Sequence, residues 1–357
     1  MSDVFTLYGA PISLYTGKVR AYLRYKNIPF IEKPITPEII KTIGYFMIPV
    51  LETPEGDLVQ DTTEIIDYLE QRFDGPSIYP DNPVQRLNAL LLEVYGDEWL
   101  VIPAMHYRWK YNRDYILREF GKSVLPDGTE EEQYAAGEQI SAPFSGSLPV
   151  LGINEASEPA IEAWYEELLR QLDDHLEGRE YLFGSRPSIA DYGLMGPLYA
   201  HNYRDPWSGT LMRARAPRLV RWVDMMNTPA PNTGRFETEP ASTLKPIMQR
   251  IFKECVPVMV ATGEALASWF EDHPDTPDIP RTIGSFNITI GDALSNRGIF
   301  PFNYWMFQRP LTYYRALGDK DKSVVDAYLH SVGGFECMQY DPEFVLKREN
   351  YRLLRVE

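Results

Sequence analysis

Cysteine is scarce in this chain of 357 residues, which holds only Cys255 and Cys337. Two cysteines this far apart make no disulfide framework and no zinc-ligand spacing. Such scarcity is typical of a reducing compartment, so we expect a cytoplasmic location. The five histidines form no paired metal motif, and no metal cofactor is expected.

Clustered basic charge and long apolar runs are lacking as well. The net charge is −16, and Lys and Arg gather nowhere in the way that a nucleic-acid-binding face requires. No run of about 18 apolar residues predicts a membrane span, and the start lacks a charged-then-apolar signal sequence. We therefore expect no nucleic-acid or membrane partner. Hydrophobic residues make up 44% of the chain, which is enough for a packed core.

The composition changes along the chain and predicts an α+β, multidomain protein. Residues 1–80 alternate strand and helix patterns in the order β-α-β-α-β-β-α, ending in a helix over 62–72, which predicts a small α/β domain. Residues 84–229 are predicted to be all-helical, and residues 236–357 form a mixed extension of unknown role.

Several finer expectations follow from local patterns. Residues 121–157, rich in Gly, Pro, Ser and acidic residues, are predicted to be a mobile excursion. Within the extension we expect a long helix over 243–272, a strand pair over 279–291, and helices over 304–317 and 323–332. The basic residues of the first helix are expected to lie mostly on a solvated face; they are Lys18, Arg20, Arg24 and Lys26.

Two features of the first domain point to a small peptide ligand. The sequence Ile48-Pro49-Val50 predicts a cis peptide bond at a strand start, which would leave the backbone of Ile48 free to pair with an extended peptide. The pair Asp61-Thr62 opens the next helix, whose N-terminal N–H groups favour a carboxylate.

These motifs resemble those of the soluble glutathione transferases, a thioredoxin-like domain followed by an all-helical one. The resemblance covers about residues 3–227 and rests on four segments in order: 7–20, Ile48–Leu51, Gln60–Thr62 and Ser188–Asp191. It implies that glutathione is the cosubstrate, that the Ile48 backbone pairs its cysteinyl part beside cis Pro49, and that Asp61 and Thr62 hold its γ-glutamyl end. It also implies a buried capping box at Ser188 and a homodimer.

The resemblance places Ser13 where a serine or cysteine activates the thiol in several classes of the family. A thiol is nucleophilic as thiolate, and a donated hydrogen bond together with a helix N-terminus would favour that anion. Ser13 could instead only cap the first helix, since serine is a favoured N-cap. Tyr8 and Tyr15 are rival hydroxyls. No cysteine occurs in residues 1–254, which disfavours thiol–disulfide exchange and favours nucleophilic attack by bound glutathione.

The second substrate is expected to be a small hydrophobic electrophile bound between the two domains. Its predicted lining consists of Tyr107, Arg108, Trp109 and Tyr111, although for each residue taken alone an ordinary helix core is the favoured interpretation. The expected reaction is conjugation or displacement of an ether or halide. The alternatives are a non-catalytic glutathione-binding or protein-interaction module and a glutathione-dependent isomerase.

Overall fold

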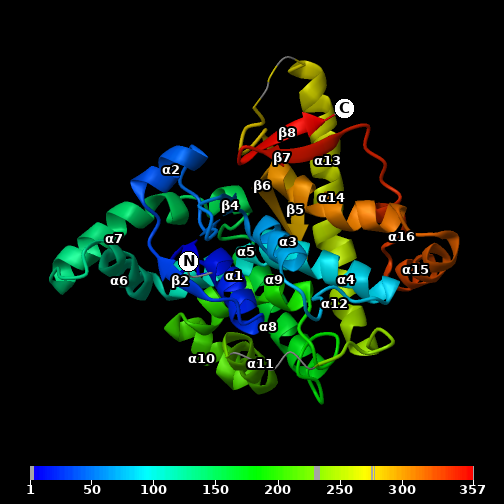
Figure 1. The fold of residues 1–357 in the computed structure, drawn as a ribbon, viewed down its shortest axis with the longest axis horizontal. Coiled ribbons are helices and arrows are strands. Elements are labelled where there is room, and N and C mark those ends of the chain that lie inside the picture. Colours follow the sequence, from blue (N-terminus) through cyan, green and yellow to red (C-terminus); the bar gives the residue numbers. More distant parts are fainter. Residues whose placement is uncertain (1–3, 229–233, 275, 277, 357) are drawn as a thin grey trace.

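The computed structural model describes residues 4–228, 234–274, 276 and 278–356. The N-terminal region is a four-stranded sheet with three helices, in the predicted order (Figure 1). Its elements are β1 (Phe5–Tyr8), α1 (Leu14–Tyr25), β2 (Phe30–Lys33), α2 (Pro37–Ile43), β3 (Val50–Glu52), β4 (Leu58–Gln60) and α3 (Thr62–Arg72).

The sheet order is β2-β1-β3-β4, with β1 parallel to β2 and antiparallel to β3. Because side chains alternate along a strand, Leu7 and Leu51 enter the main core, whereas Tyr8 and Val50 pack with Ile43 of α2 on the other face. The thioredoxin-like arrangement expected for this region is confirmed.

The middle region is helical, as predicted. A nearly continuous rod runs through α4, a π-helical turn η1 and α5, and four more helices with a second π turn, η3, complete this region. The bounds are α4 (Pro83–Val94), η1 (Tyr95–Trp99), α5 (Val101–Tyr111), α8 (Glu158–His175), α9 (Ile189–Pro197), η3 (Leu198–Tyr203), α10 (Pro206–Arg215) and α11 (Pro217–Asn227). The rod crosses α9 closely, since a Cβ on Gly96 would lie 2.4 Å from the carbonyl oxygen of Gly193. The predicted boundary at residue 229 lies outside the described residues.

The capping box at the start of α9 is confirmed. Both the backbone N–H and the hydroxyl of Ser188 donate to Asp191 Oδ2, each at 2.8 Å. The other oxygen of Asp191 accepts from the backbone of Leu182 and from the indole of Trp222. This buried carboxylate therefore ties the start of α9 to two other segments of the helical region.

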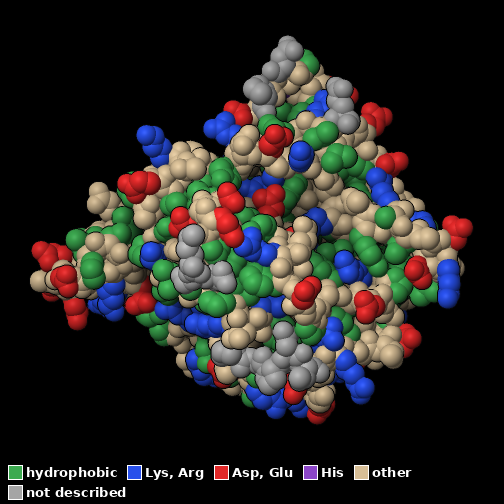
Figure 2. Space-filling model, viewed as in Figure 1, with side chains coloured by type: hydrophobic (Ala, Val, Ile, Leu, Met, Phe, Trp, Pro, Cys, Tyr) green, Lys and Arg blue, Asp and Glu red, His purple; other side chains and the backbone are tan. Residues whose placement is uncertain are grey.

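The prediction of a mobile excursion over 121–157 is wrong. Helices α6 (Arg113–Val124) and α7 (Glu130–Ser145) form a hairpin that projects from the body (Figures 1 and 2), followed by a short 3₁₀ turn, η2 (Pro149–Leu151). A capping box of Thr129 and Glu132 starts α7. The two helices approach closely at Gly121 and Gly137, where any Cβ would overlap the facing backbone. Glycines that looked like breakers in the sequence are helix-contact residues.

The extension continues the helical region. Its elements are η4 (Ser242–Leu244), α12 (Lys245–Arg250), η5 (Ile251–Cys255), α13 (Val256–Asp272), β5 (Ser285–Ile290), β6 (Ala293–Gly298), α14 (Pro301–Arg315), α15 (Asp319–Val332), α16 (Phe335–Met338), β7 (Val345–Glu349) and β8 (Arg352–Val356). The long helix over 243–272 is confirmed, with a π turn inside it. The strand pair begins at residue 285 rather than 279, and the β7–β8 hairpin was not predicted.

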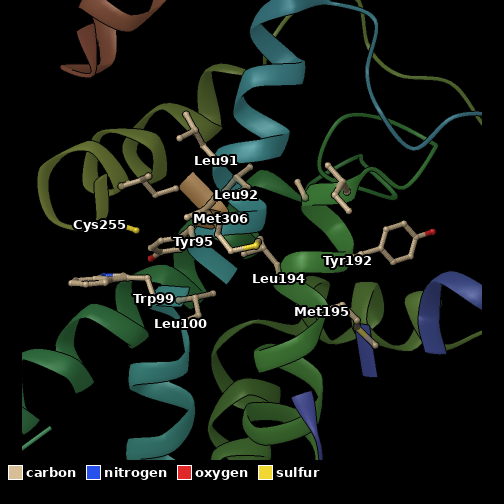
Figure 3. Close-up of a cluster of buried hydrophobic side chains, with 14 of the residues drawn as sticks. Leu91, Leu92, Tyr95, Trp99, Leu100, Tyr192, Leu194, Met195, Cys255 and Met306 are labelled. Atoms are coloured by element: carbon tan, nitrogen blue, oxygen red, sulfur yellow. The ribbon is translucent and has the colours of Figure 1, made fainter. Parts of the chain in front are cut away.

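One hydrophobic core runs through the helical region and the extension. Figure 3 shows Cys255 and Met306 of the extension beside Leu92 and Tyr95 of the helical rod. Helix α14 packs against both α13 and α4. The extension therefore shares its core with the family-like part of the chain. Among the described residues, no helix is long and apolar enough to cross a membrane.

Candidate functional site

Ser13 stands at the N-terminus of α1, in the turn that leaves β1. Its Oγ accepts a hydrogen bond from the backbone N–H of Thr16 at 3.2 Å, so it caps the helix. A hydroxyl has one donor and two acceptor sites. Capping uses an acceptor site and leaves the Ser13 proton free to donate to a ligand. The capping and thiol-activating roles are therefore compatible.

The Ile48–Pro49 peptide bond is cis, as predicted. Strand β3 begins at the next residue, and Val50 pairs with Tyr8 at the end of β1. The bend therefore lies beside the turn that carries Ser13. Among the described residues, the backbone N–H and C=O of Ile48 have no hydrogen-bond partner. The sequence predicts that these two groups pair with an extended ligand.

Asp61 holds the N-terminus of α3 in an uncommon backbone conformation, with φ +88°. A non-glycine residue in such a region costs about 1–3 kcal/mol. One carboxylate oxygen, Oδ1, accepts from the N–H groups of Thr63 at 2.9 Å and Glu64 at 3.3 Å. Thr62 is buried at the first position of the helix. Among the described residues, the second carboxylate oxygen of Asp61 accepts no hydrogen bond.

The two rival tyrosines are differently placed. The Tyr8 hydroxyl donates to Glu52 Oε2 at 2.9 Å on the α2 side of the sheet. The Tyr15 hydroxyl donates to the backbone oxygen of Asp97 at 3.0 Å. Burial raises the pKa of the Tyr15 phenol, and the carboxylates of Glu98 and Asp97 raise it further. Both hydroxyl protons are thus engaged within the protein, whereas the proton of Ser13 has no acceptor among the described residues.

A buried ion network lies directly behind α1. Lys18 Nζ lies 2.8 Å from Glu93 and 2.6 Å from Asp97, with all three side chains almost fully buried. Arg309 of the extension also binds Glu93. Although burial alone would raise it, Arg309 and Lys18 hold the pKa of Glu93 below its usual value. The network joins α1 to the helical rod and to the extension.

The prediction of a solvated basic face on α1 is therefore wrong. Arg20 pairs with Glu32 of β2 at 2.6 Å. Arg24 donates to a backbone oxygen, that of Asn227, and Lys26 pairs with Glu70. All of these partners lie outside α1, so helical periodicity could not reveal them.

A second polar cluster links the rod to the extension. The Asn303 amide donates to Glu98 Oε2, and Arg297 donates to the Glu98 backbone oxygen at 3.0 Å. Burial raises the pKa of Glu98 to about 8, with the charge of Asp97 adding to the shift and Arg297 opposing it. No sequence motif marked this cluster, because its members come from β6, α14 and η1.

Of the predicted lining of the second substrate, Arg108 has the clearest position. Its guanidinium is buried and binds both carboxylate oxygens of Asp205, at 2.7 and 3.0 Å. It also donates to the backbone oxygens of Ile12 at 3.0 Å and Ala200 at 2.7 Å. Arg108 therefore ties α5 and η3 to the turn before Ser13, and its donors are committed to the protein.

The aromatic members of that set pack among other rings. Tyr111 stacks on Trp207 at 4.0 Å between ring centroids, and Tyr107 stacks on the same ring at 5.6 Å. Trp109 lies parallel to Phe120 of α6 at 6.4 Å. These contacts point toward α10 and α6. They place the three rings in helix–helix contacts, as the alternative of an ordinary helix core anticipated.

A cavity of about 650 Å³ lies elsewhere, between α3, α4 and α14. Its polar lining includes Asp67, Tyr79 and Arg309, which bind one another. Among the described residues, no group of three or more His, Cys, Asp or Glu side chains could hold a metal ion. Cys255 is buried, and burial raises the pKa of its thiol.

Comparisons with known proteins agree with this geometry. Residues 7–77 match the N-terminal domain of glutathione S-transferases, and residues 155–224 match the C-terminal domain. A curated "Glutathione S-transferase" from Pseudomonas putida is 31% identical over 126 residues, which are 34% of this chain and 53% of the relative. The chain therefore carries both domains of the glutathione S-transferase family, at residues 7–77 and 155–224. It spans about half the length of that curated relative, so the matches do not carry over a particular reaction.

Solved structures also resemble the chain, at lower identity. The β-etherase LigF from Sphingobium is 17% identical, with a TM-score of 0.45 over 69% of this chain and 99% of its own. FzlA from C. crescentus is 19% identical, with a TM-score of 0.40 over 68% of this chain and 91% of its own. The two matched glutathione S-transferase domains end at residue 224, so most of the extension lies beyond them.

Proposed function

We propose that this protein is a glutathione transferase that activates the glutathione thiol at Ser13 for attack on a hydrophobic electrophile. The observation that carries the proposal is the backbone of Ile48, unpaired among the described residues, together with the capped N-terminus of α3 at Asp61. The bend offers a free backbone pair for the cysteinyl part, and Asp61 with Thr62 offers a carboxylate and a hydroxyl for the γ-glutamyl end.

The thiol would be activated by one hydrogen bond and one helix terminus. Lowering a thiol pKa by two units requires roughly 2.7 kcal/mol. A hydrogen bond to a charged group contributes about 1.5–3 kcal/mol, and a helix N-terminus about 0.3–1 kcal/mol. The free proton of Ser13 and the N-terminus of α1 together supply that amount. The thiolate then attacks the electrophile, and the leaving group departs with the bonding electrons in the displacement reactions.

The second substrate would meet the face of the helical rod that looks toward α1. Asp97 contacts Tyr15 of α1, and Arg108 contacts the turn before Ser13. Val101 and Met105 fall between Asp97 and Arg108 at helical spacing, so they share that face. We propose them as apolar lining. Tyr107, Arg108, Trp109 and Tyr111 remain a prediction that the packing described above disfavours.

Turnover in the presence of glutathione tests the proposal. The protein would be incubated with glutathione and a panel of aryl halides and β-aryl ethers, and the thioether product measured by mass spectrometry. Formation of a glutathione adduct that Ser13→Ala reduces supports the proposal. Glutathione binding without turnover would favour a non-catalytic module, and conversion of a maleyl-type substrate without glutathione consumption would favour an isomerase. A homodimer and a cytoplasmic location remain predictions from the sequence.

A further inference from the structure

The strained residue Asp61 is held from both sides by one side chain of the extension. Arg348 of β7 donates from Nη1 to the backbone oxygen of Gln60 at 2.8 Å and from Nη2 to the side-chain oxygen of Gln60. The same Nη1 donates to Glu64 Oε2 at 2.6 Å. One guanidinium thus spans the residue before Asp61 and the first turn of α3 after it.

The Arg348 side chain is buried and lies against two aromatic rings. Only 3% of the Arg348 side chain is exposed. The rings of Trp305 and Phe302 of α14 lie against the guanidinium, at 5.5 and 5.9 Å from their centroids. Arginine suits such a position because its planar fork presents several donors in a fixed geometry.

The hairpin that carries Arg348 is fastened to the same sheet edge. The Tyr45 hydroxyl donates to the backbone oxygen of Tyr351 at 2.6 Å, and it lies 3.2 Å from the side-chain oxygen of Gln60. Tyr351 packs with the cluster formed by Tyr8, Ile43 and Val50 on the α2 face of the sheet. Figure 1 shows the β7–β8 hairpin beside β4, the edge strand that ends at Gln60. The extension therefore covers the strand that leads into Asp61.

We propose that Arg348 is a positioning residue for the γ-glutamyl end of the glutathione site. Its guanidinium fixes Gln60 and the first turn of α3, and so holds Asp61 and Thr62 in the orientation that receives the ligand. Arg348 does not itself touch the ligand, because both of its terminal nitrogens bind Gln60 or Glu64 and its side chain is buried. The extension, which lies outside the two matched domains, thereby completes a subsite of the first domain. The inference rests on the proposed function.

Removing Arg348 would change the surroundings of Asp61 in two ways. The turn at Gln60 would lose the donors that fix its backbone and side-chain oxygens. Glu64, whose charge Arg348 compensates at 2.6 Å, would face Asp61 without a counter-ion. Both changes act on the γ-glutamyl end, whereas the Ser13 turn and the Ile48 backbone lie on other segments. We therefore expect a loss of binding affinity that depends on the γ-glutamyl part of the ligand.

Calorimetric titration of the full-length protein with two ligands tests this selectivity. Glutathione carries the γ-glutamyl group, and cysteinylglycine lacks it. In Arg348→Gln we expect glutathione affinity to fall about tenfold or more, with cysteinylglycine affinity unchanged within twofold. Arg352→Gln is the matched control, since Arg352 lies on the same hairpin but forms an exposed pair with Asp278. It should leave both affinities unchanged.

A milder variant guards against a folding defect in Arg348→Gln. Tyr45→Phe removes only the hydroxyl that joins Gln60 to the hairpin, and it should weaken glutathione binding alone by about twofold to fivefold. Equal losses for both ligands, or no loss in either variant, would overturn the inference. If the wild type binds neither ligand, the proposed function fails and the inference fails with it. If the wild type prefers glutathione and both variants keep that preference, the inference alone fails.

Discussion

Arg108 donates a hydrogen bond to the backbone oxygen of Ile12, 96 positions away in the sequence and next to Ser13. The same guanidinium forms a buried bidentate pair with Asp205. The turn that carries Ser13 is therefore supported by the helical region as well as by the N-terminal sheet.

Replacing Arg108 should lower the free energy of unfolding substantially. Arg108→Met leaves Asp205 as an uncompensated buried carboxylate, and breaking such a pair by removing one partner typically costs about 3–5 kcal/mol. We expect a loss of that size in the free energy of unfolding measured in urea. Arg170→Met, which removes an exposed pair on α8, should change it by about 0.5 kcal/mol or less. Equal effects of the two variants would contradict the structural role of Arg108.

Ser13→Ala should affect stability and turnover separately. Loss of the helix cap should lower the free energy of unfolding by about 1 kcal/mol. Loss of the donor to sulfur should lower turnover at neutral pH by about tenfold to hundredfold, as expected for a hydrogen bond to a charged group. Thr36→Ala is the matched control, because Thr36 caps α2 in the same way. It should cost similar stability and leave turnover unchanged. If Ser13→Ala also leaves turnover unchanged, Ser13 is a cap alone.

The ion network behind α1 predicts a non-additive pair of variants. Lys18→Met leaves Asp97 without its cation and Glu93 with Arg309 alone, so we expect a loss of about 3–5 kcal/mol in unfolding free energy. Adding Asp97→Asn removes a buried carboxylate that has lost its counter-ion, and it should recover part of the lost unfolding free energy. Unfolding in urea of the two single variants and the double variant gives the coupling. A double variant as unstable as the sum of both singles would show that the charges do not interact.

Glu98 predicts how stability depends on pH. Its carboxyl titrates near pH 8 in the folded protein and near pH 4.3 when exposed. Between those values the folded state holds a proton that the unfolded state releases. The protonated Glu98 carboxyl therefore contributes fully to the free energy of unfolding below about pH 4, and this contribution is lost as the pH rises to about 8. The slope from one proton is at most about 1.4 kcal/mol per pH unit. Glu98→Gln should flatten unfolding free energy against pH between 5 and 8, whereas Glu343→Gln, at an exposed position, should not. An unchanged slope in Glu98→Gln would show that this carboxyl is ionised in the folded protein.

The sequence predicted those parts of the molecule that local chemistry determines. The bend at Ile48–Pro49, the helix start at Asp61 and the capping box at Ser188 each depend on a few adjacent residues whose conformational preferences agree. Alternation and helical spacing likewise located the sheet and most of the helices.

The contacts between distant segments could not be predicted in this way. Arg348 meets Gln60 across 288 positions, and Arg309 meets Glu93 across 216. Nothing near Arg348 in the sequence marks it, since a lone arginine on a short strand is usually exposed. The sequence predicts a mobile excursion over 121–157, where the structure has the end of α6 and all of α7, because glycines that usually break helices serve here in close packing between helices.

The pKa of the glutathione thiol in its complex with the protein tests the central claim most directly. Thiolate absorbs in the ultraviolet where the thiol does not, so absorbance of the complex can be followed against pH for the wild type and Ser13→Ala. The account predicts that the bound thiol titrates about two units below its free value near 8.5 in the wild type, and that Ser13→Ala moves it most of the way back. A bound thiol that titrates near 8.5 in both proteins would contradict it.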